Sequence, residues 1–182
     1  MPQLQRLEIR LSTLNQLFNS FDPSPFHQKD LDRDAEEYIV GWADEFAPKA
    51  SFELAIRLPA DQLEQAERSD VGRAVHNYFA NRAQQTRRSM RFQLREGRTA
   101  LAIGLVFLFA CMSLRQLVGL VLPAEVAGHI LQEGLLILGW VAMWRPLQIF
   151  LYDWWPIRHF AALYEKLSVT PVRLQAEQSA PS

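Results

Sequence analysis

The hydrophobic pattern separates a long apolar stretch from a charged N-terminal half. Sixteen residues from Thr99 to Leu114 carry no charge, and the apolar run resumes after Arg115 and Gln116. At about 1.5 Å per residue, residues 99–122 form a helix of about 36 Å, enough to cross a hydrocarbon core of about 30 Å. A second run, 130–152, is uncharged at its centre. We predict transmembrane helices at 99–122 and 130–152, joined by an outer turn at 123–129.

The alternative is a helical hairpin buried inside a soluble protein. Such a hairpin needs a polar stripe along each helix, because one side of each helix faces water. Thr99–Leu114 is apolar on all sides, and the rest of the chain is too short to cover two such helices. The pattern therefore favours a membrane hairpin.

The N-terminal half shows patterns of a small α/β domain. Residues 7–11 and 52–58 alternate between apolar and charged positions, which is typical of half-buried strands. Between them, Asp32 is a suitable N-cap for a helix at 33–46. Its expected core face consists of Ala35, Tyr38, Ile39, Trp42 and Phe46.

A further helix is expected from about Ala60, with a break near Ser69 and Asp70, after which it resumes and continues into the first span. The predicted fold is an α+β membrane protein, with a β-α-α-β-α cytoplasmic domain at 1–80 followed by the two-helix transmembrane hairpin. The long connection between the strands permits a parallel crossover.

A sheet of two strands is marginally stable alone, and its open edges invite further pairing. We therefore expect another copy of the chain, or a membrane protein partner, to complete the sheet. This expectation makes the protein a homo-oligomer or a subunit of a membrane complex.

The distribution of basic residues predicts the orientation. Six arginines precede the first span within the arginine-rich juxtamembrane helix 81–98, no Lys or Arg lies between Gln116 and Gln132, and three basic residues follow the second span. Basic flanks stay in the cytoplasm. The N-terminal residues lack the apolar core of a signal peptide. Both termini are therefore expected in the cytoplasm, at an inner (plasma) membrane.

The residues after the second span form a predicted amphipathic helix at 153–168. Its apolar positions are Ile157, Phe160, Ala161, Tyr164 and Leu167. Such a helix lies on the inner membrane interface or packs on the domain. Residues 169–182 are expected to be a disordered tail.

Arg115 and Glu133 are charged residues inside the predicted spans, where charge is costly unless it is paired or reaches water. In an antiparallel hairpin the two lie at similar depth, and the same register sets Gly104 opposite Trp144. We predict an ion pair that holds the hairpin. An ion or proton relay is the alternative, but the inner halves of both spans lack the further groups that a relay needs.

The remaining cations are assigned to lipid. Five arginines precede the first span and are expected to contact anionic headgroups rather than nucleic acid, because they adjoin a membrane helix: Arg87, Arg88, Arg91, Arg95 and Arg98. Arg145, near the inner end of the second span, is expected to extend to the headgroups as well.

Catalytic and metal-binding motifs were sought in the polar loop 22–37, which contains His27. Asp30, Asp32 and Asp34 have the first spacings of an EF-hand, but Ala35 and Gly41 occupy the positions that require Gly and Glu. A turn that leads into a capped helix explains the loop. With one cysteine, Cys111, no disulfide forms within the chain. The sequence thus predicts no catalytic residue, cofactor or metal site.

The segment Trp144-Arg145-Pro146, followed by Phe150-Leu-Tyr-Asp-Trp-Trp-Pro156, resembles the end of uncharacterised small two-span inner-membrane proteins of bacteria. The resemblance implies a bacterial inner membrane, and the segment carries no catalytic residues.

Three functions remain open from the sequence. The first is a non-enzymatic interaction or assembly module, anchored at the cytoplasmic face of the membrane. The second is a sensor of anionic lipid, or of a small phosphorylated ligand, that acts through the juxtamembrane arginines. The third is an enzyme that uses the Asp/His loop 22–37.

Overall fold

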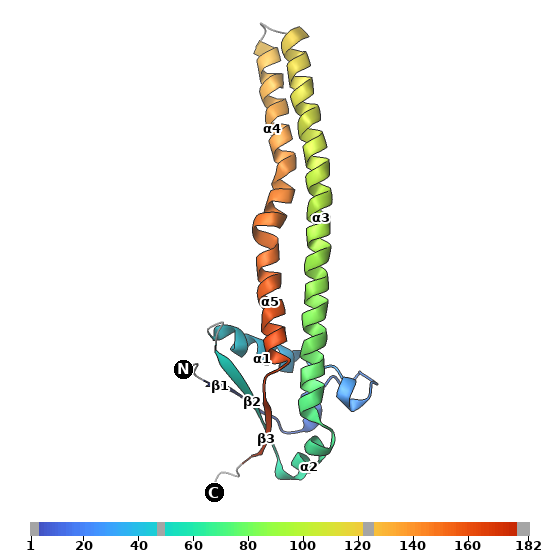
Figure 1. Ribbon diagram of the computed structural model, residues 1–182, viewed down its shortest axis with the longest axis vertical. Coiled ribbons are helices and arrows are strands. Elements are labelled where there is room, and N and C mark those ends of the chain that lie inside the picture. Colours follow the sequence, from blue (N-terminus) through green and yellow to red (C-terminus); the bar gives the residue numbers. More distant parts are fainter. Residues whose placement is uncertain (1–3, 47–49, 122–125, 178–182) are drawn as a thin grey trace. The chain divides into compact units, whose positions relative to one another are not determined.

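The computed structural model describes residues 4–46, 50–121 and 126–177 (Figure 1). It divides into two compact units. One unit comprises the described residues up to Thr86 and from His159 onward, and the other runs from Arg87 to Arg158. Each unit is described by itself. Residues 122–125 of the expected outer turn and the end of the expected tail lie outside the described residues.

The first unit contains a three-stranded parallel sheet in the order β1-β2-β3 (Figure 1). The strands are β1 (Leu4–Arg10), β2 (Ser51–Leu58) and β3 (Val172–Ala176). The first two and their parallel crossover agree with the sequence prediction. The third corrects it, because β3 lies in the segment that was expected to be disordered. The chain's own C-terminal segment, rather than a partner, fills one edge of β2.

The sheet has one apolar and one charged face. Leu54 of β2 is the register partner of both Leu7 and Val172, and Ile56 is that of Ile9 and Leu174. This row of apolar residues lies in the core of the unit.

On the opposite face, cross-strand ion pairs cover the central strand. The Arg57 Nε lies 2.5 Å from the Glu8 Oε1, and Arg173 pairs with Glu53. Beneath these side chains Ala55 is fully buried. Charged residues thus shield this face, as is common for a sheet with one face on a core.

Four helices pack against the apolar face and contribute to a single hydrophobic core. They are α1 (Arg33–Glu45), α2 (Ala60–Arg68), the start of α3 (Val71–Val121) and the end of α5 (Trp154–Leu167). Two 3₁₀ turns, η1 (Leu14–Gln16) and η2 (Phe26–Gln28), precede α1. The unit is therefore a two-layer α/β domain.

Helix α1 begins as predicted but turns a different face inward. The Asp32 side chain accepts a hydrogen bond from the Asp34 amide and caps the helix. Ala35, Ile39 and Ala43 are buried, whereas Tyr38 and Trp42 are 45% and 38% exposed. The core therefore contains aliphatic residues of α1, and the two aromatic rings contact each other at the surface, with centroids 5.3 Å apart. The prediction that both rings belong to the core was wrong.

The predicted break between the second and third helices is present. Asp70 joins α2 to α3 with a φ of 48°, in the left-handed region that Asp tolerates better than most residues. From Val71 the chain then continues as one helix of 51 residues.

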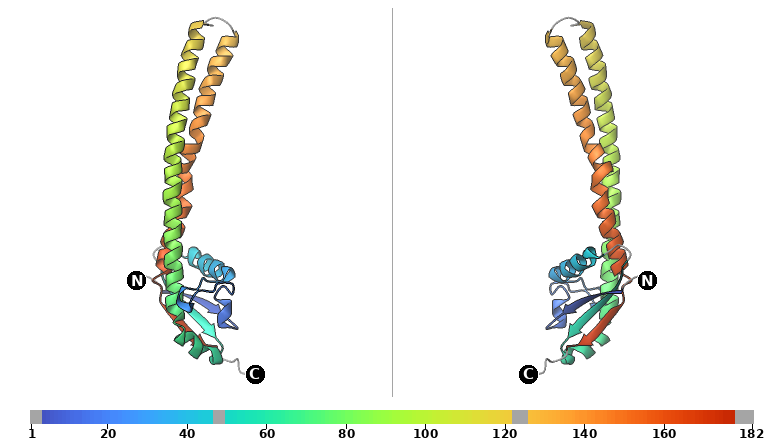
Figure 2. Two further views of the ribbon diagram at one scale, coloured as in Figure 1. Left: turned by 90° about the vertical axis from the view of Figure 1, so that its right-hand side faces the viewer. Right: turned by 90° about the vertical axis from the view of Figure 1, so that its left-hand side faces the viewer.

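The second unit is an antiparallel hairpin formed by α3 and α4 (Val126–Gln148), followed by the π-helix η3 (Ile149–Asp153) and the first residues of α5 (Figure 2). Glycines let the two helices approach closely. A Cβ on Gly139 would lie 2.8 Å from the Leu108 Cδ1, and one on Gly104 would lie 3.0 Å from the Ala142 carbonyl oxygen.

Pro146 leaves the Ala142 carbonyl, against which Gly104 packs, without its usual helical hydrogen bond. Proline lacks the N–H that an α-helix directs to the carbonyl four residues earlier, which here belongs to Ala142. Gly104 lies against this oxygen, where any larger residue would crowd it. The register differs from the predicted one, in which Gly104 faces Trp144. Trp144 is instead 72% exposed.

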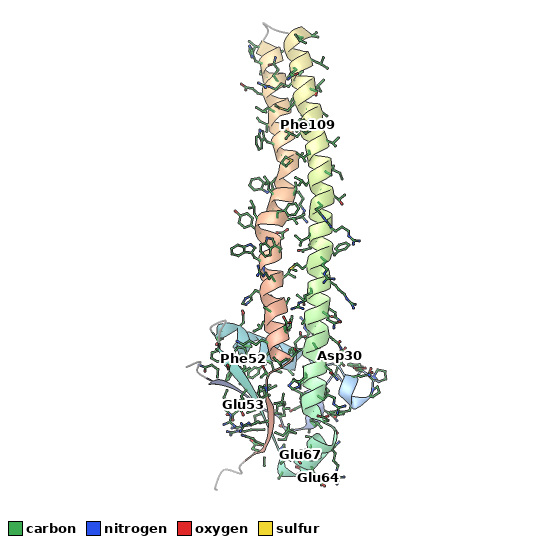
Figure 3. All side chains as sticks on the ribbon, in the orientation of Figure 1. Asp30, Phe52, Glu53, Glu64, Glu67 and Phe109 are labelled. Carbon is green, nitrogen blue, oxygen red and sulfur yellow. The ribbon has the colours of Figure 1, made fainter. Side chains whose placement is uncertain are left out.

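The structure has two helical segments that are long and apolar enough to cross a membrane. Their most apolar 18-residue windows have mean hydropathies of 2.0, within Val71–Val121, and 1.5, within Val126–Leu167. Only 11% and 22% of these windows are buried. Apolar side chains project outward along both helices (Figure 3).

Candidate functional site

The juxtamembrane arginines form one continuous stripe on α3. With 3.6 residues per turn, Arg87, Arg88, Arg91, Arg95 and Arg98 fall within about 100° of the helix circumference, over a length of about 17 Å. All five are exposed. Among the described residues, Arg88, Arg91, Arg95 and Arg98 form no ion pair with an acidic side chain.

The arginine stripe points away from the second helix of the hairpin. Gly97 and Gly104 contact η3 and α4, and they lie on the opposite side of α3 from the arginines. Farther along the arginine side are Val106 and Phe109, which are 71% and 68% exposed. A single helix face thus changes from cationic to apolar, which is the pattern expected of a helix that enters a bilayer from its headgroups.

Arg145 is held by protein groups. Its Nη2 lies 3.7 Å from the Glu96 Oε1 on α3, and its Nη1 lies 3.7 Å from the Asp153 Oδ2 in η3. Its side chain is still 59% exposed, so contact with headgroups remains sterically possible. The sequence analysis assigned Arg145 to lipid alone and missed both carboxylates.

Arg115 and Glu133 are not joined among the described residues. Arg115 lies on the inner side of α3, and its Nε is buried without a hydrogen-bond acceptor. Glu133 is exposed and lies on the outward side of α4 with Ile137 and Trp140. The residue of α4 that faces α3 at this level is Gln132, which lies against Gly119. The ion pair remains a prediction, and a test is given in the Discussion.

The loop 22–37 folds as the turn that the sequence predicted. The Asp22 carboxylate accepts hydrogen bonds from the amides of Ser24 and Asp30, at 2.9 and 2.7 Å. These bonds lower the pKa of Asp22, with the Asp30 amide as the largest cause. Asp22 and Asp32 are thus used by the backbone. No group of three His, Cys, Asp or Glu residues in the described part of the chain is arranged to hold a metal ion.

The sequence analysis missed a charged network on the domain. Glu36 of α1 is only 8% exposed. It accepts hydrogen bonds from the Tyr78 hydroxyl at 2.7 Å and from the Arg82 Nε and Nη2 at 2.7 and 3.1 Å. The Arg82 guanidinium also lies 5.8 Å from the centroid of the Tyr164 ring of α5. The network joins α1, α3 and α5, which are distant in sequence, so local patterns could not show it.

The network lines an open cleft of about 770 Å³. The lining also includes the acidic residues Asp30, Glu37 and Asp44 and the aromatic residues Phe160 and Tyr164. Burial is the first cause that raises the pKa of Tyr78, followed by its hydrogen bond to Glu36. Tyr78 therefore stays protonated at neutral pH and acts as a donor to Glu36. Its role in this arrangement is structural.

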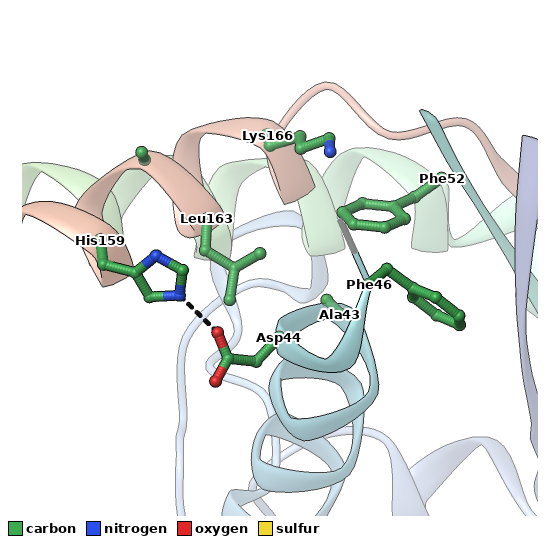
Figure 4. Close-up of a pocket in the computed structure, with 8 residues that line it drawn as sticks. Ala43, Asp44, Phe46, Phe52, His159, Leu163 and Lys166 are labelled. Carbon is green, nitrogen blue, oxygen red and sulfur yellow. Dashed lines mark hydrogen bonds and ion pairs between the residues drawn. The ribbon is translucent and has the colours of Figure 1, made fainter. Parts of the chain in front are cut away.

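A smaller cavity of about 80 Å³ lies between α1 and α5 (Figure 4). At its mouth His159 hydrogen-bonds to the Asp44 carboxylate, and Lys166 lies 4.0 Å from the centroid of the Phe52 ring. Burial lowers the pKa of Lys166. A His–Asp pair orients a general base in many hydrolases. However, none of the described residues that line this cavity is Ser, Thr or Cys, and its volume suits a few water molecules rather than a substrate.

Comparisons with protein-family models, curated proteins and solved structures found no match.

Proposed function

We propose that the chain is a non-enzymatic interaction module, anchored in a bacterial inner membrane by its helical hairpin with the domain and both termini in the cytoplasm. One observation carries the proposal. The core of the domain is assembled from segments on both sides of the hairpin: Leu163 and Leu167 pack in the same core as Val75 and Phe79. A core of this kind requires the two flanks to lie on one side of a bilayer, and therefore an even number of spans.

The shared core supports this topology without reference to charge. The excess of basic residues on both flanks of the hairpin also favours cytoplasmic flanks, so the packing and the charge distribution agree. The domain offers surfaces for partners, namely the exposed Tyr38–Trp42 pair and the cleft above Glu36. Exposed aromatic rings of this kind are enriched at interaction sites.

Topology reporters test the anchoring. A reporter that is active only in the cytoplasm should be active when fused after Ser182, and one that is active only outside should be active when inserted between Leu122 and Val126. The same two reporters in the opposite positions are the matched controls. A cytoplasmic signal from the insertion between the helices contradicts the hairpin.

A second candidate function is recognition of anionic lipid, and the arginine stripe favours it. Phosphatidylglycerol added to the full-length protein in neutral detergent should raise the melting temperature, while phosphatidylcholine should not. Replacing Arg88, Arg91 and Arg95 by Gln should remove most of the increase. Replacing Arg33 and Arg68 by Gln is the control, because both are exposed on the domain and pair with neighbours on their own helices.

Inorganic phosphate in the same assay separates lipid from a small phosphorylated ligand. An increase with phosphate that equals the increase with phosphatidylglycerol indicates recognition of the phosphate alone. An equal increase in the triple variant contradicts a role for the stripe.

A further inference from the structure

Glu133 occupies an unusual place on the hairpin. It lies on the outward side of α4, where Ile137 and Trp140 are both 62% exposed. No cation of the described residues pairs with it. A carboxylate that faces lipid is costly, and intramembrane charges are usually paired or turned toward protein.

A groove adjoins Glu133 on the surface of the hairpin. It has a volume of about 500 Å³ and lies between α3 and α4. Its apolar lining is Leu108, Phe109, Met112, Leu136 and Trp140, and its polar residues are Ser113 and Gln116. Leu136 and Trp140 are three and seven positions from Glu133, so all three lie on one side of α4.

The outer end of the groove brings polar groups to one level. Two helix contacts fix this level, namely Gly139 against Cys111 and Gly119 against Gln132. Arg115 and Gln116 lie between the two contacts on α3, and Glu133 lies between them on α4. Arg115 is half-buried on the side of α3 that faces α4, and Gln116 is exposed and lines the groove. Each hairpin thus carries a carboxylate, a guanidinium and a side-chain amide at similar depth.

We propose that a second copy of this chain docks on the groove within the membrane. Two copies inserted in the same orientation are related by a two-fold axis along the membrane normal, so equal residues lie at equal depth. Trp140 of each copy enters the groove of the other, and Glu133 of each copy accepts hydrogen bonds from Arg115 and Gln116 of the other. The complementary charges favour a second copy over lipid as the occupant.

This inference rests on the proposed membrane location and moves self-association from the sheet to the hairpin. Interhelical hydrogen bonds in membranes each contribute modestly to association. Two symmetric sets of these hydrogen bonds, together with two tryptophans in grooves, are strong enough to sustain a reversible membrane dimer.

The test uses the full-length protein in vesicles, with donor and acceptor fluorescent proteins fused after Ser182. Energy transfer should increase with the protein-to-lipid ratio above the level expected for random proximity. Trp140→Ala should raise the apparent dissociation constant by about tenfold or more, because buried Trp residues dominate such interfaces. Trp144→Ala is the matched control, since Trp144 is also exposed, at 72% against 62% for Trp140, but lies outside the groove.

Substitutions at Glu133 test the polar contact. Glu133→Leu should raise the dissociation constant by about tenfold, whereas Glu133→Gln should raise it less, by about threefold, because an amide still accepts a hydrogen bond. Equal effects of the two substitutions overturn the polar contact, and equal effects of Trp140→Ala and Trp144→Ala overturn the groove.

Flotation of the vesicles after an alkaline wash separates this inference from the proposed function. Protein that does not float is not inserted, and this result overturns both. Protein that floats but transfers energy only at the random level retains its anchoring, and this result overturns the dimer alone.

Discussion

Ile56 and Leu174 are register partners in adjacent parallel strands, although both helices of the hairpin lie between them in the chain. Leu174 is one of only five residues in β3, yet it extends the apolar row of the sheet. The domain therefore depends on its C-terminal segment. Most of the predictions below follow from the contacts of such distant residues.

Leu174→Ala should destabilise the domain. The substitution removes apolar contacts at a half-buried site, and we expect a loss of about 1–2 kcal/mol, below the range for fully buried leucines. Thermal unfolding of the full-length protein in detergent, followed by circular dichroism, measures the loss. Val169→Ala is the control, because Val169 is 74% exposed. Equal stability of the Leu174→Ala and Val169→Ala proteins would mean that β3 contributes little to the stability of the domain.

Arg82→Leu should leave the Glu36 carboxylate without its cation. Because Glu36 is nearly buried while the Arg82 side chain is 41% exposed, the expected loss is about 1–3 kcal/mol, the cost of an unsatisfied buried acceptor. Arg88→Leu removes an exposed arginine from the same helix and should change the free energy of unfolding by less than about 0.5 kcal/mol. A similar loss in both variants contradicts the importance of the network.

Tyr78 should make the protein sensitive to alkaline pH. Its pKa is raised in the folded protein, so above the usual tyrosine pKa of about 10 the unfolded chain releases a proton that the folded chain keeps. This contribution to stability is complete below about pH 10 and is lost as the pH rises further.

Tyr78→Phe should therefore make the alkaline decrease in melting temperature shallower. Tyr38→Phe should leave it unchanged, because Tyr38 is 45% exposed. If the melting temperature of the Tyr78→Phe protein falls with rising pH as steeply as that of the parent protein, groups other than Tyr78 cause the alkaline sensitivity.

A double-mutant cycle tests the contact between Arg115 and Glu133 within one chain. At high dilution in detergent, where copies are separated, the two Leu substitutions should be additive within about 0.5 kcal/mol, because Glu133 points outward. If the double variant instead recovers the stability that each single variant loses, Arg115 and Glu133 do form an ion pair within one hairpin.

Gly104 should be intolerant of larger side chains. A Cβ there meets the backbone oxygen of Ala142 at 3.0 Å, so Gly104→Leu should force the helices apart and lower the melting temperature by several degrees, equivalent to about 1–3 kcal/mol of overpacking. Gly134→Leu is the control, because no atom lies within 4 Å of its Cβ position. If both variants melt alike, the close approach of the helices is not important for stability.

The sequence predicted the elements whose signal is local. The alternation at 52–58, the cap at Asp32 and the break at Asp70 each depend on neighbouring residues, and the structure contains all three. Whether Ala43 or Trp42 is buried depends on the space that the other elements leave in the core, and the helical spacing of apolar residues gives no information about that space.

The contacts that sequence analysis missed join distant segments. Val172 and Leu174 alternate with Arg173 and Gln175, but five residues near the chain end are a weak strand signal unless the partner strand is known. The network of Glu36 with Tyr78 and Arg82 and the pair of His159 with Asp44 likewise cross more than 40 residues. The arginines of the stripe could be singled out from the sequence because all of them lie on one helix, and their contact with lipid headgroups remains a prediction.

The position of β3 after the hairpin sets an order on biosynthesis. Until the segment that follows the hairpin has been made, β2 has an open edge, so the domain is completed only after the hairpin. A chain that inserted one span instead of two would leave its C-terminal segment on the wrong side of the bilayer. Its unfinished sheet would expose a strand edge of the kind that chaperones and proteases recognise. If the hairpin spans a bilayer, completion of the sheet therefore depends on the insertion of both spans.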